Sequence, residues 1–136
     1  MQRPRDRWRS AALFFLVVSL VKLFYTSFGL KLLTVAPVSG GAGMRGWAME
    51  NPKAFGMMVA GAYLASSIFC FVLATALQQR RRWAVRAGQF YAAFQMLGVL
   101  FFKAFGVMAI VNFVFGLSAL VVLGLIDVDE TPPGRQ

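Results

Sequence analysis

Residues 52–86, PKAFGMMVAGAYLASSIFCFVLATALQQRRRWAVR, join a long apolar segment directly to a cluster of arginines. From Pro52 to Leu77 the only charged residue is Lys53. A helix of about 20 apolar residues is long enough to cross a bilayer. The cluster that follows holds four arginines and no acidic residue. This boundary is typical of a transmembrane helix whose end is held at the cytoplasmic surface.

Three further apolar segments, at about residues 11–33, 83–102 and 106–126, fill most of the remaining chain. Of the 136 residues, 59% are hydrophobic and 14% are charged, whereas a soluble domain carries roughly 25% charged residues. Four spans and their connections use up this length. We therefore expect one all-α domain over residues 1–136, an integral membrane bundle of four transmembrane helices. The short connection at residues 103–106 predicts that the last two helices form a tight antiparallel hairpin.

The distribution of basic residues predicts the orientation in the membrane. The first ten residues hold four arginines against one acid, and the stretch QQRRRWAVR after Leu77 holds another four. The first loop has only Arg45 and Lys53, near Glu50, with Lys31 just before it, and the third has only Lys103. Because cytoplasmic connections carry the excess of lysine and arginine, we expect both termini in the cytoplasm. A positive start and an apolar run also describe a signal peptide, but this run is long and Lys22 interrupts it, so we expect it to be retained.

The formal net charge of +9 would suggest nucleic-acid binding in a soluble protein. Here the arginines stand at the ends of apolar segments, where they meet anionic lipid headgroups. We therefore expect membrane lipids as partners and no nucleic acid. The predicted headgroup and orientation contacts are Arg80, Arg81, Arg82 and Arg86.

Several kinds of chemistry are not expected from this composition. The chain has no histidine and a single cysteine, Cys70, and none of its four apolar segments contains an aspartate or glutamate. Proton-coupled transporters usually place a carboxylate or histidine at membrane depth. Phosphate-binding glycine loops, serine nucleophile elbows and CxxC pairs are also missing. We expect no enzymatic activity, no cofactor and no metal site.

Lys22 lies near the middle of the first apolar segment, where a charge costs about 2.5–3.5 kcal/mol on insertion scales. Ser19, Lys22, Thr26 and Gly29 recur at helical spacing, which predicts one polar stripe facing the bundle interior. Asn112 in the fourth segment is a further candidate for this site. The stripe either binds a ligand, ion or lipid headgroup, or holds a lysine that snorkels or is hydrogen-bonded locally.

The second apolar segment carries small residues four positions apart. Small residues let two membrane helices approach closely. This spacing predicts a helix-packing face, used inside the bundle or for docking against another protein. Its members are Ala62, Ser66, Cys70 and Ala74.

Two parts of the chain lack a helical pattern. We expect residues 34–51 to form a flexible, glycine-rich loop with Trp47 at the membrane interface. Asn51 and Pro52 predict a helix start, as the N-cap and first helical residue. The acidic, proline-containing tail at residues 127–136 is expected to be disordered.

The junction RRRWAVRAG, Arg80 to Gly88, joins an arginine cluster to Trp-Ala at the start of the third span. In this general layout the chain resembles many small four-span bacterial membrane proteins, which implies the bacterial inner (plasma) membrane. The resemblance identifies no family and transfers no active-site residue. We expect a non-catalytic accessory or structural subunit of a larger membrane complex, partnered by other membrane subunits or by itself. The alternative is a small oligomeric transporter, channel or lipid-binding protein that uses the Lys22 stripe.

Overall fold

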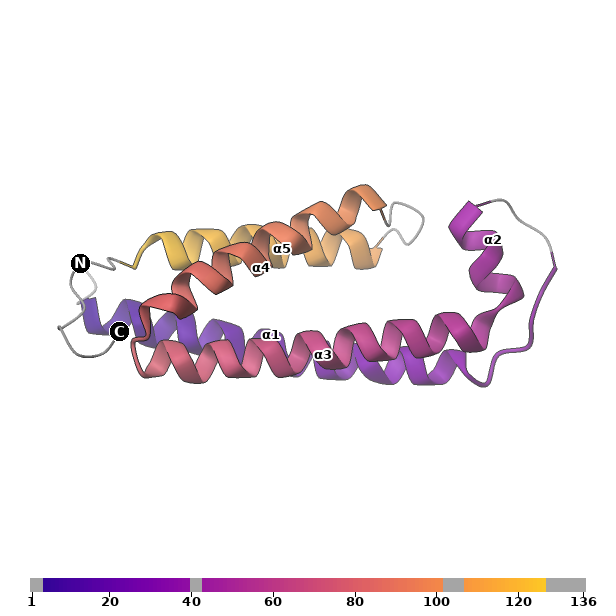
Figure 1. Ribbon diagram of the computed structural model, residues 1–136, viewed down its shortest axis with the longest axis horizontal. Coiled ribbons are helices and arrows are strands. Elements are labelled where there is room, and N and C mark those ends of the chain that lie inside the picture. Colours follow the sequence, from indigo (N-terminus) through magenta and orange to yellow (C-terminus); the bar gives the residue numbers. More distant parts are fainter. Residues whose placement is uncertain (1–3, 40–42, 102–106, 127–136) are drawn as a thin grey trace. The chain divides into compact units, whose positions relative to one another are not determined.

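The computed structural model describes residues 4–39, 43–101 and 107–126. These residues form helices and contain no strand, so the all-α prediction is confirmed. The predicted turn at residues 103–106 and the predicted disordered tail lie outside the described residues. The helices, drawn in Figure 1, are α1 (Pro4–Leu32), α2 (Gly43–Glu50), α3 (Pro52–Gln78), α4 (Arg82–Phe101) and α5 (Val107–Gly124).

The chain divides into two compact units. Unit 1 consists of Met1–Val18 and Cys70–Gln136, and unit 2 consists of Ser19–Phe69. Unit 1 therefore contains the first half of α1, the end of α3, and all of α4 and α5. Unit 2 contains the second half of α1, all of α2 and most of α3.

Two helical segments are long and apolar enough to cross a membrane, by length and composition: Asp6–Leu32 and Pro52–Gln78. In α5 the apolar part is shorter, at Ala109–Gly124. Helix α4 is long enough but not apolar enough for this test, since it begins at Arg82 and carries further polar residues along its length. Among the described residues, two of the four predicted spans are therefore supported by this measure.

Helix α1 begins earlier than the apolar pattern predicts, at Pro4 rather than at about residue 11. Proline suits the first helical position because its missing N–H would have no intrahelical partner there. Asp6 in the first turn and Lys31 in the last turn complement the partial charges of the helix ends. Arginine is a good helix former, so the charged start of the chain extends the apolar helix.

The connection from α3 to α4 is a Schellman turn with arginine in the left-handed position. The Arg81 N–H donates to the Ala76 carbonyl, and the Arg80 N–H donates to the Leu77 carbonyl, both at 3.0 Å. This pair of bonds satisfies carbonyls at the end of α3 and requires a left-handed residue after the helix. Arg80 takes that conformation with φ of 55°. Glycine usually occupies such positions because it has no Cβ to clash there.

We expect Arg80→Gly to stabilise the folded chain by about 0.5–1 kcal/mol, because glycine adopts the left-handed conformation without strain. Thermal denaturation of the purified chain in a neutral detergent measures this. Arg86→Gly is the control, because it removes the same charge from the interior of α4 and should destabilise by a similar amount. A lower melting temperature for Arg80→Gly than for the wild type would contradict the assigned turn.

Unit 1 is held together by an apolar core to which four helical segments contribute. Its members include Trp8 and Phe15 of α1, Leu77 of α3, Val85 of α4 and Leu123 of α5, all at most 6% exposed. Helices α4 and α5 run antiparallel and pack closely, as a hairpin requires. Added Cβ atoms at Gly88 and Gly116 would lie 2.7 Å from Leu123 and Met96, respectively.

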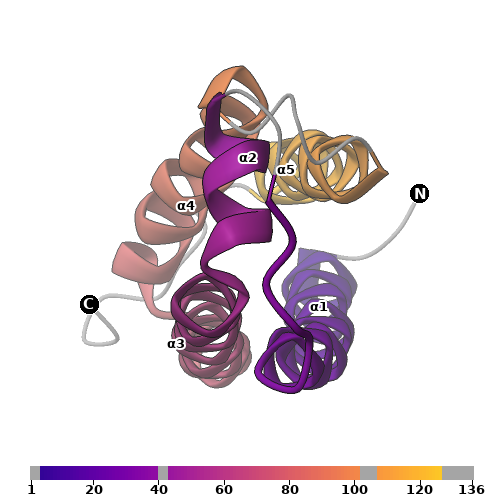
Figure 2. The same ribbon diagram turned by 90° about the vertical axis from the view of Figure 1, so that its right-hand side faces the viewer.

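Unit 2 contains a helix within residues 34–51, where the glycine-rich sequence predicts only a flexible loop. Helix α2 occupies Gly43–Glu50, so the expectation of an unstructured segment at residues 34–51 is wrong for this part. The Trp47 ring meets the Phe55 ring edge-on at 6.4 Å, and the Val38 N–H donates to the Met49 carbonyl at 2.9 Å. The ring contact joins α2 to the start of α3, and the hydrogen bond joins it to the segment that follows α1; Figure 2 shows α2 beside the start of α3.

Asn51 joins α2 to α3. Its carbonyl accepts the first helical hydrogen bond of α3, from the Phe55 N–H at 3.0 Å, which is the N-cap position that the sequence predicts. Its side-chain amide donates back to the Trp47 carbonyl at 3.3 Å. The side chain therefore helps to close the end of α2.

Candidate functional site

In unit 2, α1 and α3 form an antiparallel pair in which the two backbones nearly touch. A Cβ added at Gly29 would lie 2.6 Å from the Ala60 backbone nitrogen, and one added at Gly56 would lie 2.7 Å from the Gly29 carbonyl oxygen. Both distances are shorter than a carbon atom can approach a nitrogen or oxygen atom to which it is not bonded. Glycine at these two positions therefore permits the close approach, in the manner of small-residue membrane helix pairs.

Two buried serines join the same helices by reciprocal hydrogen bonds. The Ser19 hydroxyl donates to the Ser67 carbonyl, and the Ser67 hydroxyl donates to the Ser19 carbonyl, each at 2.8 Å. The two hydroxyl oxygens lie 3.2 Å apart. Each buried hydroxyl finds an acceptor on the opposite helix, which fixes the register of the pair. Interhelical bonds of this kind contribute about 0.6 kcal/mol each in membranes.

Lys22 lies one helical turn after Ser19 and is only 1% exposed. Its ammonium nitrogen lies 5.2 Å from the centroid of the Tyr63 ring, which is within cation–π range. The Tyr25 and Tyr63 rings are 5.4 Å apart between centroids. The buried polar cluster of unit 2 therefore consists of Ser19, Lys22, Tyr63 and Ser67, with Tyr25 beside it.

The other two predicted members of this site, Thr26 and Asn112, are not part of the buried cluster. The Thr26 hydroxyl donates to the Lys22 carbonyl of its own helix at 3.1 Å, and its side chain is half-buried. Asn112 belongs to unit 1, where it is half-buried on α5. The structure thus brings together Ser19 and Lys22, with Thr26 adjacent to them along the helix.

The predicted packing face on α3 is only partly buried. Cys70 and Ala74 lie in the core of unit 1, whereas Ala62 is exposed and Ser66 is half-buried in unit 2. A spacing of four residues advances 400° per step instead of 360°, so the line through these residues turns around the helix. Within this chain, Cys70 and Ala74 of the predicted face are used for packing, whereas Ala62 is exposed, because the buried positions of unit 2 lie on a different side of α3.

Tyr63 and Ser67 are the two cluster residues that are not among the site residues predicted from the sequence. The pattern that marks them is an alternating spacing of four, three and four residues in Gly56, Ala60, Tyr63 and Ser67. This spacing averages about 3.6 residues and keeps one side of a helix toward its partner. Ser67, rather than the adjacent Ser66, is therefore the buried serine.

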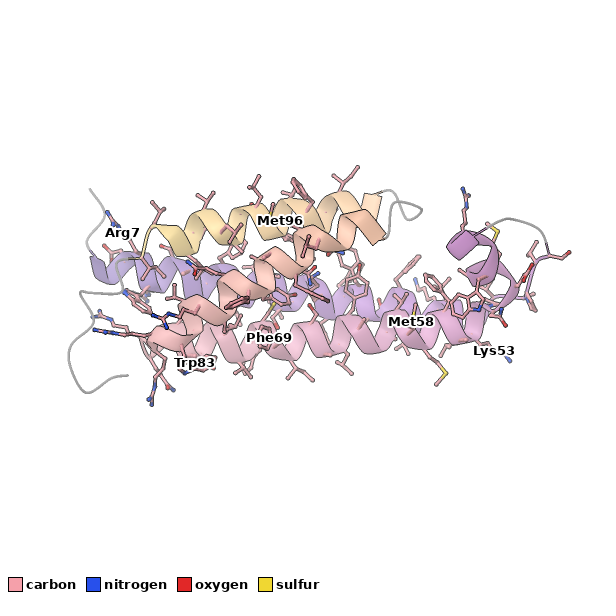
Figure 3. All side chains as sticks on the ribbon, turned by 45° about the horizontal axis from the view of Figure 1, so that its top comes forward. Arg7, Lys53, Met58, Phe69, Trp83 and Met96 are labelled. Carbon is pink, nitrogen blue, oxygen red and sulfur yellow. The ribbon has the colours of Figure 1, made fainter. Side chains whose placement is uncertain are left out.

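The four predicted headgroup arginines lie around the start of α4 in unit 1. Arg81 and Arg86 are exposed, while Arg80 and Arg82 are half-buried. Arg7 of α1 is at the same end of the unit, since its guanidinium donates to the Leu125 carbonyl after α5 at 3.0 Å. Figure 3 shows Arg7 and Trp83 at this end.

The chemistry of the buried polar cluster is that of one cation, two hydroxyls and aromatic faces. Among the described residues, no group of three or more His, Cys, Asp or Glu side chains is placed to hold a metal ion. Comparisons with protein families, with curated proteins and with solved structures gave no match.

Proposed function

We propose that this chain is a small integral membrane protein of the bacterial inner membrane, and that it acts as a non-catalytic accessory or structural subunit of a larger complex. In this proposal α1, α3, α4 and α5 all cross the bilayer, with both termini in the cytoplasm. The observation that carries it is the exposure of large apolar side chains on all four helices.

These exposed side chains are numerous for a chain of this size. Phe24 on α1 is 73% exposed, Ile68 on α3 58%, Phe90 on α4 78% and Ile110 on α5 62%. Soluble monomers rarely expose large contiguous apolar patches. In the two candidate spans only 39% and 28% of the most apolar window is buried. A core helix of a soluble protein would be mostly buried, so lipid is the solvent that fits these surfaces best.

The lengths of the helices are compatible with four crossings. Helix α4 has 20 residues and α5 has 18. At 1.5 Å per residue these helices are about 30 and 27 Å long, close to the roughly 30 Å thickness of the hydrocarbon core. The first two turns of α4 carry Arg82, Trp83 and Arg86. In a membrane Arg82 and Trp83 would lie at the headgroups, and the long side chain of Arg86 would extend toward them from the next turn.

The interior of unit 2 favours a structural role over transport. The near contact of backbones at Gly29, Gly56 and Ala60 leaves no space for a solute between α1 and α3 at that level. The reciprocal serine bonds close the pair at another level. A pair joined in this way serves as a rigid element on which other subunits can pack.

A second candidate function is favoured by the burial of Lys22. A small oligomeric transporter, channel or lipid-binding protein would use this ammonium group, with Ser19 and Tyr63 beside it, to contact an anionic ligand. Ionisable residues at membrane depth are expensive and commonly functional. The two candidates differ in what copurifies with the chain from its native membrane in a mild detergent. Stoichiometric protein partners support the first, whereas a homo-oligomer with bound lipid or solute supports the second.

The orientation is tested by a reporter fused after Gln136. We expect a reporter that is active only in the cytoplasm to work, and one that is active only outside to fail, because both arginine-rich regions favour the cytoplasmic side. A fusion truncated after Met49 is the control and should give the opposite pattern. Activity of the external reporter at Gln136 would refute the four-span topology.

A further inference from the structure

We infer that the arginine-bearing end of unit 1 is a binding surface for the phosphate of anionic phospholipids. This inference deepens the proposed function, on which it rests for the membrane location, by naming a lipid class and the surface that takes it. The surface is called the basic end below. It consists of Arg9 on α1, Arg80 and Arg81 between α3 and α4, and Trp83 and Arg86 on α4.

Three separate segments bring these charges to one end of the unit. Arg7 donates to the Leu125 carbonyl, so the start of α1 lies at the end of α5. Trp8, the next residue, belongs to the same apolar core as Leu77 and Ala84, and these two residues flank the α3–α4 connection. Figure 1 shows the beginning of α1, the end of α3 and the beginning of α4 together at one end of unit 1.

Among the described residues of the basic end, arginines outnumber acids. Arg9, Arg81 and Arg86 are exposed. Arg9, Arg80 and Arg86 form no ion pair with another described residue. The only described acid in these segments is Asp6. Guanidinium groups bind phosphate oxygens through paired hydrogen bonds, so the surface is complementary to a phosphodiester headgroup.

Trp83 and Arg80 supply two independent indications of a lipid surface. Trp83 is 47% exposed between Arg82 and Arg86, and tryptophan flanked by basic residues is typical of the membrane–water interface. Arg80 keeps its positive charge at a left-handed position that glycine would occupy with less strain. A headgroup contact accounts for arginine at this position.

The test measures the melting temperature of the full-length chain in mixed micelles as phosphatidylglycerol replaces phosphatidylcholine. Each arginine near an anionic lipid surface strengthens binding by about fivefold, so three together contribute on the order of 100-fold. We expect phosphatidylglycerol to raise the melting temperature of the wild type. The variant Arg9→Gln/Arg80→Gln/Arg86→Gln should lose most of that rise.

The matched control is Lys31→Gln/Arg45→Gln/Lys53→Gln, which removes three exposed basic charges from unit 2. It has the same net charge as the first variant and should keep the wild-type response. An equal loss in both variants, or a loss in neither, overturns the inference. A rise of equal size with inorganic phosphate alone assigns the surface to free anions and overturns lipid as the ligand.

Arg80→Gly separates binding from folding. It should raise the melting temperature in neutral detergent, as argued above, yet reduce the additional rise from phosphatidylglycerol. An undiminished response in this variant would overturn the role given to Arg80. The membrane location is tested independently by extracting native membranes at alkaline pH. Release of the chain would refute integral insertion, while the lipid response would still be decided by the titration.

Discussion

Gly29→Ala is expected to destabilise the chain by about 1–3 kcal/mol, although alanine is the better helix former. The added methyl carbon would lie 2.6 Å from the Ala60 nitrogen and 2.9 Å from its Cα. Both are backbone atoms, so no side chain can rotate away, and α1 and α3 must separate. That separation also strains the reciprocal bonds of Ser19 and Ser67. Thermal denaturation of the purified chain in detergent measures the loss.

Gly61→Ala is the matched control, because Gly61 is also inside a long helix, α3, but has no atom within 4 Å of its added Cβ. It should be neutral or stabilising by about 0.5–1 kcal/mol, from helix propensity alone. The same chemical change therefore has opposite signs at the two sites. Equal stability of Gly29→Ala and Gly61→Ala would mean that the close approach of α1 and α3 does not exist.

Replacing Lys22 separates its packing from its charge. Lys22→Ala is expected to cost about 2–5 kcal/mol, because it empties the space of a long buried side chain. Lys22→Met keeps that volume and places a thioether near Tyr63, where sulfur–aromatic contacts are favourable. It also removes a charge that is expensive to bury. We therefore expect Lys22→Met to be at least as stable as the wild type.

The same Lys22→Met variant distinguishes the two candidate functions. If the chain is an accessory subunit and Lys22 serves packing, the variant should retain the partners that copurify with the wild type. If Lys22 contacts a ligand, the variant should remain folded but lose the copurifying lipid or solute. Thermal stability and retention are measured on the same preparation, so unfolding cannot be mistaken for lost binding.

The helices themselves could be predicted from local features of the chain. The apolar segments and the Asn51–Pro52 start placed α3 within one residue at each end, because length, hydropathy and capping act over neighbouring residues. The polar stripe of Ser19 and Lys22 was also visible, since helical spacing alone puts these residues on one side. Helix α2 was not predicted, because the tertiary contacts of Trp47 and Val38 hold a short, glycine-containing helix that local propensity does not favour.

By itself, the sequence determined that this protein is helical, rich in apolar surface, basic at particular helix ends, and without histidine. These properties follow from the composition and from the spacing of apolar and charged residues along the chain. They can be read without knowing which helix packs against which. Only the tertiary structure decided that Ser67 rather than Ser66 meets Ser19, that Tyr63 covers Lys22, and that Gly29 and Gly56 bring two backbones together. Adjacent residues on a helix differ by 100°, so the rotation of α3 against α1 selects among them, and that rotation depends on the packing of both helices at once.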